Sequence, residues 1–413
     1  MKQEVQVGWR GAIVALTWLA LSAAVAIGMA DVPLAAQTKF SQEGRAWVEE
    51  TSGKLPEAHS LHIQTILGNV TIQGGGNEPR YVVRKRSLAP SAQGARNAFR
   101  RFSVTVARQS DAAYIRGAWT EPKATNDGQL SADILLLVPR EMNLVTVDTR
   151  CGSITVTSTD AKLELGTRAG VVSVDDASGI VRVRTMGGNV TIGRVGGDLF
   201  IHSSGGGDVR AGFARGRVEV SSQGGNMFFD TVGSLSLQAA GNVDVRHCFG
   251  DLTVRTVGGS VTLGEIGGSA RIENGGGNIR LGSVRGRVMA STTGGNIEMW
   301  KVGGGAQAIS GNGAITAEFI GTQPSSFQAS YLRTSSGDIV VYLDRGTQAT
   351  VQASSELALG SWGISSDFPE LNIINEGTGP GPRVTYAQGA VNGGGPMLKV
   401  QTTVGQIAFR RSK

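Results

Sequence analysis

Hydrophobic and polar residues alternate along the middle of the chain in short runs, and each run is introduced by a glycine. A typical run is Gly188-Asn-Val-Thr-Ile, with apolar residues at the second and fourth positions after the glycine. Side chains two residues apart lie on the same face of a strand. The pattern therefore predicts short β-strands with one buried face, each preceded by a glycine turn.

These runs return at a nearly constant spacing. The steps between leading glycines from Gly152 to Gly313 are 18, 18, 19, 18, 16, 18, 18, 18 and 18 residues, and a second series from Gly179 to Gly286 falls about halfway between them. A fixed period near 20 residues is typical of stacked supersecondary units. We predict an all-β parallel β-solenoid (β-helix) with about 18 residues and two short strands per coil. Less regular β flanks would cap both ends. Eight side chains of this register are predicted to be buried: Val190, Ile192, Leu199, Ile201, Val261, Leu263, Ile279 and Leu281.

Outside the repeats the pattern is weaker. It predicts a short helix or a strand within residues 41–58, a loop at 88–98, and a second loop at 377–382. Strands are expected at 61–65, 68–72, 81–85, 102–107, 113–117, 134–139, 326–331, 337–342, 349–353 and 398–409. The expected organisation is an N-terminal flank with the first coils at 37–150, a regular core at 151–320, and C-terminal coils with a cap at 321–413.

The first 36 residues have the features of a secretory signal. Lys2 and Arg10 precede an apolar run at residues 12–30, and small residues at 34–36 offer a cleavage site. An uncleaved N-terminal anchor is the alternative, since the run is close to the minimum for a membrane span. We therefore expect an exported bacterial protein that is periplasmic, on the cell surface or secreted, and that meets a membrane only through this segment if it is retained.

The composition is glycine-rich, with 61 glycines in 413 residues, and the formal net charge is +6. We take this charge to be spread too thinly for nucleic-acid binding, which requires a concentrated basic patch. Cys151 and Cys248 lie five coils apart, roughly 24 Å at the spacing of parallel strands, so they should not form a disulfide. Cys248 occupies a position held elsewhere by Val195 or Ile266 and is predicted to be a small core residue.

A resemblance to a known family rests on three segments. The segment Val138-Pro-Arg-Glu-Met-Asn-Leu-Val-Thr-Val-Asp-Thr-Arg-Cys-Gly-Ser-Ile-Thr-Val resembles the element of bacterial putative-adhesin proteins in which a strand ending at proline leads into the first glycine coil. Residues 61–72 are similar to the opening strand pair of that family, and residues 389–409 to its closing segment. The resemblance covers residue 60 to the C-terminus and implies an exported β-solenoid with a domain of unknown function. It brings no catalytic motif.

No chemical constellation predicts an enzyme, a metal site or a cofactor. Asp198, Asp208 and Asp251 follow glycines, but the same position in neighbouring coils holds arginine or serine, so a calcium ladder is not expected. His59 and His62 stand alone as a weak metal signal, most simply a solvated strand start. The adjacent pair Asp175-Asp176 is interpreted as a turn. The core also has no loop insertions to wall a substrate cleft.

The outward positions of the second series offer one candidate binding surface. Arg182 and Arg184 are followed one coil later by Phe200 and His202, a cationic and aromatic patch suited to sugars or anionic groups. The alternative is an ordinary solvated face with ion pairs such as Arg255 with Glu273. We therefore predict a non-enzymatic interaction module, an adhesin or surface-binding protein, with polysaccharide or another envelope protein as partner. An envelope-stress sensing or accessory protein is the alternative function, and a carbohydrate-active enzyme the third.

Overall fold

The computed structural model describes residues 36–121, 130–321, 327–358, 363–376 and 383–412, and in these residues it contains 34 strands and one helix. The predicted signal or anchor at 1–36 lies almost entirely outside the described residues. Within the described part of the chain, no helix combines the length and apolar character needed to span a membrane.

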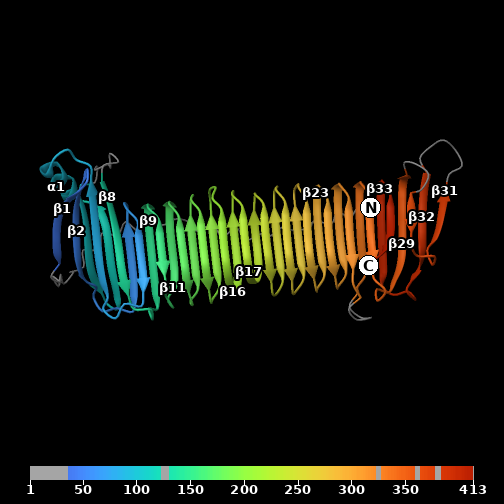
Figure 1. Cartoon of the computed structure of the whole chain (residues 1–413), viewed down its shortest axis with the longest axis horizontal. Coiled ribbons are helices and arrows are strands. Elements are labelled where there is room, and N and C mark those ends of the chain that lie inside the picture. The colour runs from blue at the N-terminus through green and yellow to red at the C-terminus, as the bar shows by residue number, and fades with distance from the viewer. Residues whose placement is uncertain (1–35, 122–129, 322–326, 359–362, 377–382, 413) are drawn as a thin grey trace, which may run out of the picture. The chain divides into compact units, whose positions relative to one another are not determined.

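The strands stack into two long ladders, in which neighbouring strands are mainly parallel (Figure 1). Along the chain, one strand belongs to the first ladder and the next to the second, so that each coil contributes to both. Val172, for example, pairs with Ile154 on one side and with Val190 on the other. The fold is therefore all-β and of the solenoid type. The first ladder contains β4 (Val70–Gly74), β10 (Ile154–Thr157), β12 (Val172–Ala177), β14 (Val190–Val195), the first halves of β16 (Val209–Ser222) and β17 (Met227–Ala239), β18 (Val243–Cys248), β20 (Val261–Ile266), β22 (Ile279–Val284), β24 (Ile297–Val302), β26 (Ile315–Phe319), β28 (Ile339–Leu343) and β34 (Ile407–Arg411). The second ladder contains β3 (Ser60–Thr65), β9 (Leu144–Cys151), β11 (Lys162–Ala169), β13 (Val181–Thr185), β15 (Leu199–Ser203), the second halves of β16 and β17, β19 (Leu252–Thr256), β21 (Ala270–Asn274), β23 (Val288–Gly294), β25 (Ala306–Asn312), β27 (Ser330–Ser336) and β33 (Met397–Val404).

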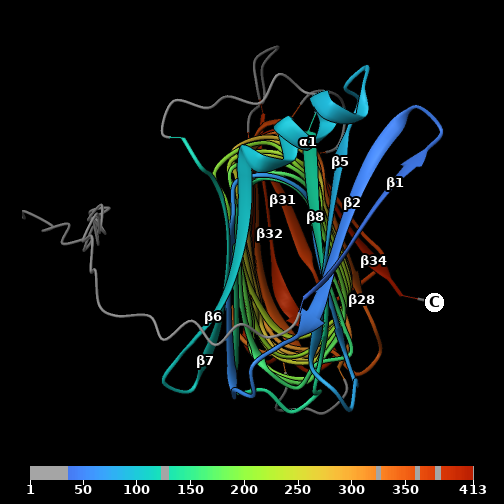
Figure 2. The ribbon, with the colours of Figure 1, turned by 90° about the vertical axis from the view of Figure 1, so that its left-hand side faces the viewer.

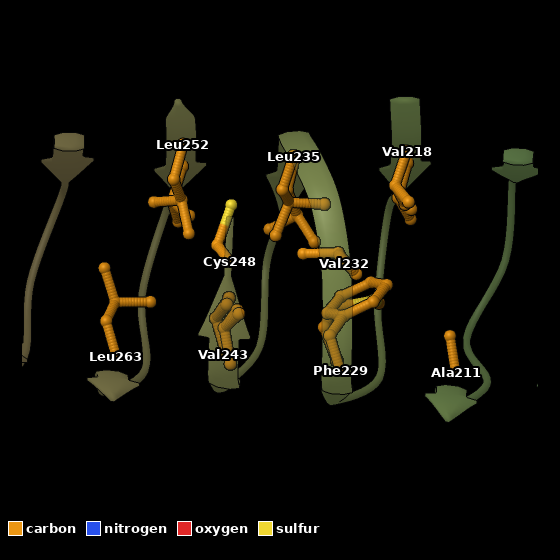
Figure 3. Close-up of a cluster of buried hydrophobic side chains, with 14 of the residues drawn as sticks. Ala211, Val218, Phe229, Val232, Leu235, Val243, Cys248, Leu252 and Leu263 are labelled. Atoms are coloured by element: carbon orange, nitrogen blue, oxygen red, sulfur yellow. The ribbon is translucent and has the colours of Figure 1, made fainter. Parts of the chain in front are cut away.

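The core lies between the two ladders. One continuous cluster of buried apolar side chains extends from Leu55 to Phe409, and the eight side chains predicted to be buried are all in it. Neighbouring coils match large side chains with small ones, as where Phe229 pairs with Ala211 (Figure 3). Cys248 is a free, buried thiol in line with Val232 and Ile266, so its predicted core position is confirmed. Burial raises the pKa of this thiol.

Glycines allow successive coils to approach each other at the corner that leads into the first ladder. Gly188 has φ +100°, and a Cβ there would lie 2.2 Å from the carbonyl oxygen of Gly170 in the preceding coil. Gly277 repeats this arrangement, with φ +97° and a distance of 2.3 Å to the oxygen of Gly259. Only a residue without Cβ fits there at low cost. Buried hydroxyl and amide side chains just before the corner donate hydrogen bonds to carbonyl oxygens of the corner glycines. The donors are Thr167, Thr185, Ser203, Ser222, Thr256, Asn274, Thr292 and Ser310.

The N-terminal end of the stack is closed by a segment that doubles back. The coil formed by β3 and β4 lies between β7 and β8 on its outer side and β9 and β10 on its inner side. Antiparallel strands extend both ladders beyond it, and α1 contacts β2, β5 and β6 (Figure 2). We call this part the N-terminal cap. It consists of β1 (Gln37–Glu43), β2 (Ala46–Lys54), β5 (Arg80–Ser87), α1 (Ala92–Arg100), β6 (Phe102–Gln109), β7 (Ala112–Trp119) and β8 (Leu130–Val138).

The C-terminal end of the stack is likewise closed by a segment that doubles back. The last two strands, β33 and β34, are inserted between β27 and β28 on one side and β29 and β30 on the other. β32 and β31 then continue the second ladder in antiparallel order. The outermost strands are β29 (Ala349–Ala358), β30 (Ile364–Ser366), β31 (Asn372–Glu376) and β32 (Arg383–Val391).

The structure corrects the prediction of a loop at residues 88–98. Residues 92–100 form α1, whose N-cap Ser91 accepts a hydrogen bond from the backbone N–H of Gly94. Ala95 and Phe99, one helical turn apart, are buried in a small second core with Phe102. A serine cap followed by apolar residues four apart is a helix signal that the many small residues of this segment obscured.

Other predictions for the flanks need smaller corrections. Of the two alternatives predicted for residues 41–58, the strand is confirmed and the helix is wrong, since the chain forms the end of β1 and then β2. The strand predicted at 326–331 begins only at Ser330, and the single strand predicted at 398–409 is two strands separated by Gly405, which has φ +149°. The loop predicted at 377–382 lies outside the described residues. Asp175 and Asp176 belong to β12 and not to a turn, because Asp176 pairs with Arg194 of the next coil.

Candidate binding surface

The two ladders place the predicted patch residues on adjacent strands of one outer face. Arg182 of β13 pairs with Phe200 of β15, and Arg184 pairs with His202 two positions further along. The intervening Val183 and Ile201 point into the core. Because the strands are in register, the four polar and aromatic side chains meet in one area. We call this area the second-ladder patch.

The second-ladder patch combines a stacked cation with a shallow hollow. The Arg182 guanidinium lies 4.8 Å from the centre of the Phe200 ring. The hollow has a volume of about 370 Å³, and its floor continues over the next two coils past Ser221, Ser236 and Gln238. A guanidinium stacked on a ring keeps its N–H edge free for carboxylate or sulfate oxygens, which it binds through paired hydrogen bonds.

The charges around the patch leave its two arginines without a carboxylate partner. Among the described residues, neither Arg182 nor Arg184 forms an ion pair. Glu164, the neighbour of Arg182 on β11, is bonded to Lys162. That hydrogen bond lowers the pKa of Glu164, and both arginines lower it further. On the opposite side of the patch, Glu219 pairs with Arg217. The patch therefore presents net positive charge.

The structure shows a second group of this kind that the sequence analysis did not identify. On the first ladder, the guanidinium of Arg210 lies 4.8 Å from the ring centre of Phe228, and that of Arg194 lies 5.9 Å from the ring centre of Phe213. Arg210 also forms an ion pair with Asp208 at 3.0 Å. The signal was present in the sequence, because a phenylalanine follows an arginine at the same outward position one coil later.

The residues that follow the corner glycines form hydrogen bonds between neighbouring coils. The Asp208 carboxylate accepts a 3.0 Å hydrogen bond from the backbone N–H of Asn226, and the Asn226 side chain accepts one from Asn242 in the next coil. Asp198 and Asp251 accept backbone N–H groups at the other corner in the same way. These aspartates are thus engaged with backbone amides. Within the described residues, no group of three or more His, Cys, Asp or Glu side chains is placed to hold a metal ion.

The remaining candidates are engaged in local pairs. His59 lies 2.9 Å from a carboxylate oxygen of Asp111, whose pKa this interaction lowers, and the His62 ring stacks on Tyr114 with their centres 4.9 Å apart. The predicted ion pair of Arg255 with Glu273 is confirmed, and Arg280 and Glu298 form another pair between neighbouring coils.

Comparisons with known proteins give similar solved structures but no sequence match. No family model matches the chain, and no curated protein matches it. A putative adhesin from Bacteroides fragilis NCTC 9343 is 18% identical over 57% of this chain and 98% of its own, with a TM-score of 0.35. Putative adhesins from Parabacteroides distasonis ATCC 8503 (11% identity, 71% of this chain and 94% of its own, TM-score 0.24) and Parabacteroides merdae ATCC 43184 (9%, 89% and 96%, TM-score 0.22) are also similar. These belong to the kind of protein that the sequence resembles, and at such TM-scores they carry no argument about this chain.

Proposed function

We propose that this protein is a non-enzymatic, exported binding module that recognises acidic polysaccharide on the outer face of its second ladder. The observation that carries the proposal is the second-ladder patch. There, Arg182 and Arg184 have no carboxylate partner among the described residues, and the Arg182 guanidinium lies over the ring of Phe200 in the next coil. Two other outward arginines of that face, Arg255 and Arg271, are both paired with Glu273.

We further propose that each coil contains about 18 residues and two strands. Equivalent outward positions then recur in each successive coil, at a spacing of about 4.8 Å. Repeating sugar units would then meet several rungs at once. The open, shallow surface of the patch suits an extended polymer better than a small substrate, which needs enclosing walls.

Polygalacturonate is the probe that tests this function, with neutral dextran of equal length as the reference ligand. The purified protein should bind polygalacturonate, and the double variant Arg182→Ala/Phe200→Ala should bind it at least about tenfold more weakly, because it loses a free cation and its stacking surface. Arg271→Ala/Met289→Ala is the matched control, since Arg271 and Met289 pair at the same positions further along the ladder.

Circular dichroism should show that both double variants remain folded. Equal binding by wild type and the Arg182→Ala/Phe200→Ala variant would remove the patch from consideration. Cleavage of the polysaccharide by wild type would overturn the non-enzymatic assignment.

A further inference from the structure

The positive charge of the protein is concentrated in the N-terminal cap, contrary to the expectation that it is thinly spread. Residues 80–116 contain nine lysines and arginines and a single acidic residue, Asp111. The whole chain carries a net charge of only +6, so the remainder of the chain is slightly acidic. These residues form β5, α1, β6 and β7, which belong to one end of the coil stack.

Much of this charge is free of carboxylates. Arg80, Arg86 and Arg100 are exposed, and none of them forms an ion pair among the described residues. Two further basic residues are neutralised, namely Arg84 by Glu43 and Lys85 by Glu49. Asp111 is itself bonded to His59. Three of the nearby carboxylates, Glu43, Glu49 and Asp111, are thus engaged, and more basic than acidic side chains of the cap face solvent.

The cations come from several elements around the end of the stack. β5 extends the first ladder, β6 and β7 extend the second, and α1 lies at the same end in contact with β5 and β6 (Figure 2). Arg80 and Arg86 come from β5, Arg100 from the last turn of α1, and Arg108 and Arg116 from the other side. A charged end of this kind is complementary to an extended anionic plane.

We propose that the N-terminal cap docks on the anionic phospholipid surface of a membrane. Basic residues are attracted to anionic headgroups within about one Debye length, roughly 10 Å. Two further features favour a lipid surface. The apolar run at 12–30 is only six residues from Gln37, a span of about 20 Å when extended. Leu88, beside Arg86, is 62% exposed and available to the interfacial layer. This proposal is independent of the polysaccharide patch.

Co-sedimentation with vesicles tests the proposal. The full chain is mixed with phosphatidylcholine vesicles, and with vesicles in which 30% of the lipid is phosphatidylglycerol. Any contribution of the apolar segment appears with both kinds of vesicle, so the readout is the extra binding to the anionic ones. We expect this extra binding to fall at least about tenfold in the variant Arg80→Glu/Arg86→Glu/Arg100→Glu, and to fall at 0.5 M NaCl.

The matched control is Arg285→Glu/Arg287→Glu/Arg333→Glu, which changes the net charge equally at exposed positions far from the cap. It should retain the extra binding. The variant with glutamine at the three cap positions should show a smaller loss, and it keeps the test valid if the glutamate variant unfolds. Equal losses in cap and control variants would overturn the proposal. So would a cap variant whose affinity for soluble polygalacturonate falls as much as its affinity for vesicles, since that result marks a general polyanion site.

Discussion

At the scale of single residues, the corner glycines set how closely the coils can stack. Gly277 has both a left-handed backbone and a carbonyl oxygen 2.3 Å from where a Cβ would lie. Its neighbour Gly276 has no atom within 4 Å of the same point and does not adopt positive φ. Two glycines adjacent in sequence therefore serve different purposes, and only the second is required by the geometry of the coil.

This difference gives a direct test. Gly277→Ala should destabilise the protein by about 2 kcal/mol or more, because the new methyl group forces β22 away from the preceding coil and the backbone is strained. Gly276→Ala should change the stability by less than about 0.5 kcal/mol. Thermal unfolding followed by circular dichroism compares the two variants. Equal melting temperatures would contradict this account of the corner.

At the scale of elements, hydrogen bonds at the corners fix the register of consecutive strands. The Asp208 carboxylate, just before β16, accepts a hydrogen bond from the backbone N–H of Asn226, just before β17. In other coils an asparagine side chain is the acceptor, as where Asn278 accepts a hydrogen bond from the backbone N–H of Asn296. The Asn226 N–H bond is also the main reason why the pKa of Asp208 lies below its ordinary value.

Substitutions of Asp208 should therefore separate charge from hydrogen bonding. Asp208→Asn keeps an acceptor for Asn226 but loses the charge and the ion pair with Arg210, and it should cost about 0.5 kcal/mol at pH 7, whereas Asp208→Ala should cost about 1 kcal/mol or more. Because the pKa is lowered in the folded state, the contribution of the carboxylate is present above the ordinary carboxyl range near pH 4. It is lost as the pH falls through the lowered value. Melting temperatures between pH 7 and pH 2.5 should thus fall less in Asp208→Asn than in wild type.

Sequence patterns predict the regular coils and fail at the ends, for a physical reason. Within the coils each strand pairs with its equivalent one period away, so the local run Gly188-Asn-Val-Thr-Ile also fixes the register. The same regularity brought Arg182 beside Phe200. At the ends the chain doubles back, and this reversal determines which strands pair. Nothing in the local pattern of β33 indicates that it lies between β27 and β29. The basic cap was missed because the charge was averaged over the whole chain.

At the scale of the whole stack, both ends use the same topological device. At each end one pair of strands is placed out of chain order: β7 and β8 follow β3 and β4 in the chain but lie outside them, and β29 and β30 precede β33 and β34 but lie outside them. Antiparallel strands then extend the ladders, so that the open edges are irregular. Such edges resist the end-to-end pairing that a bare parallel rung would invite. Between these ends the coils are equivalent, and their number should be adjustable.

Deletion of whole and half periods tests this equivalence. Removing residues 260–277 joins Gly259 to Asn278, a sequence that already occurs at other corners, and takes away β20 and β21 together. Later strands then keep their ladders, and we expect a folded protein whose melting temperature falls by roughly 5 °C or less. Removing only residues 260–268 deletes β20 alone and moves every later strand to the opposite ladder. The residues before and after each strand then no longer fit the corners of that ladder, and the C-terminal strands pair with the wrong partners. This variant should unfold far earlier or aggregate. If the half-period deletion were as stable as the full one, the structural unit would be nine residues and the two ladders interchangeable.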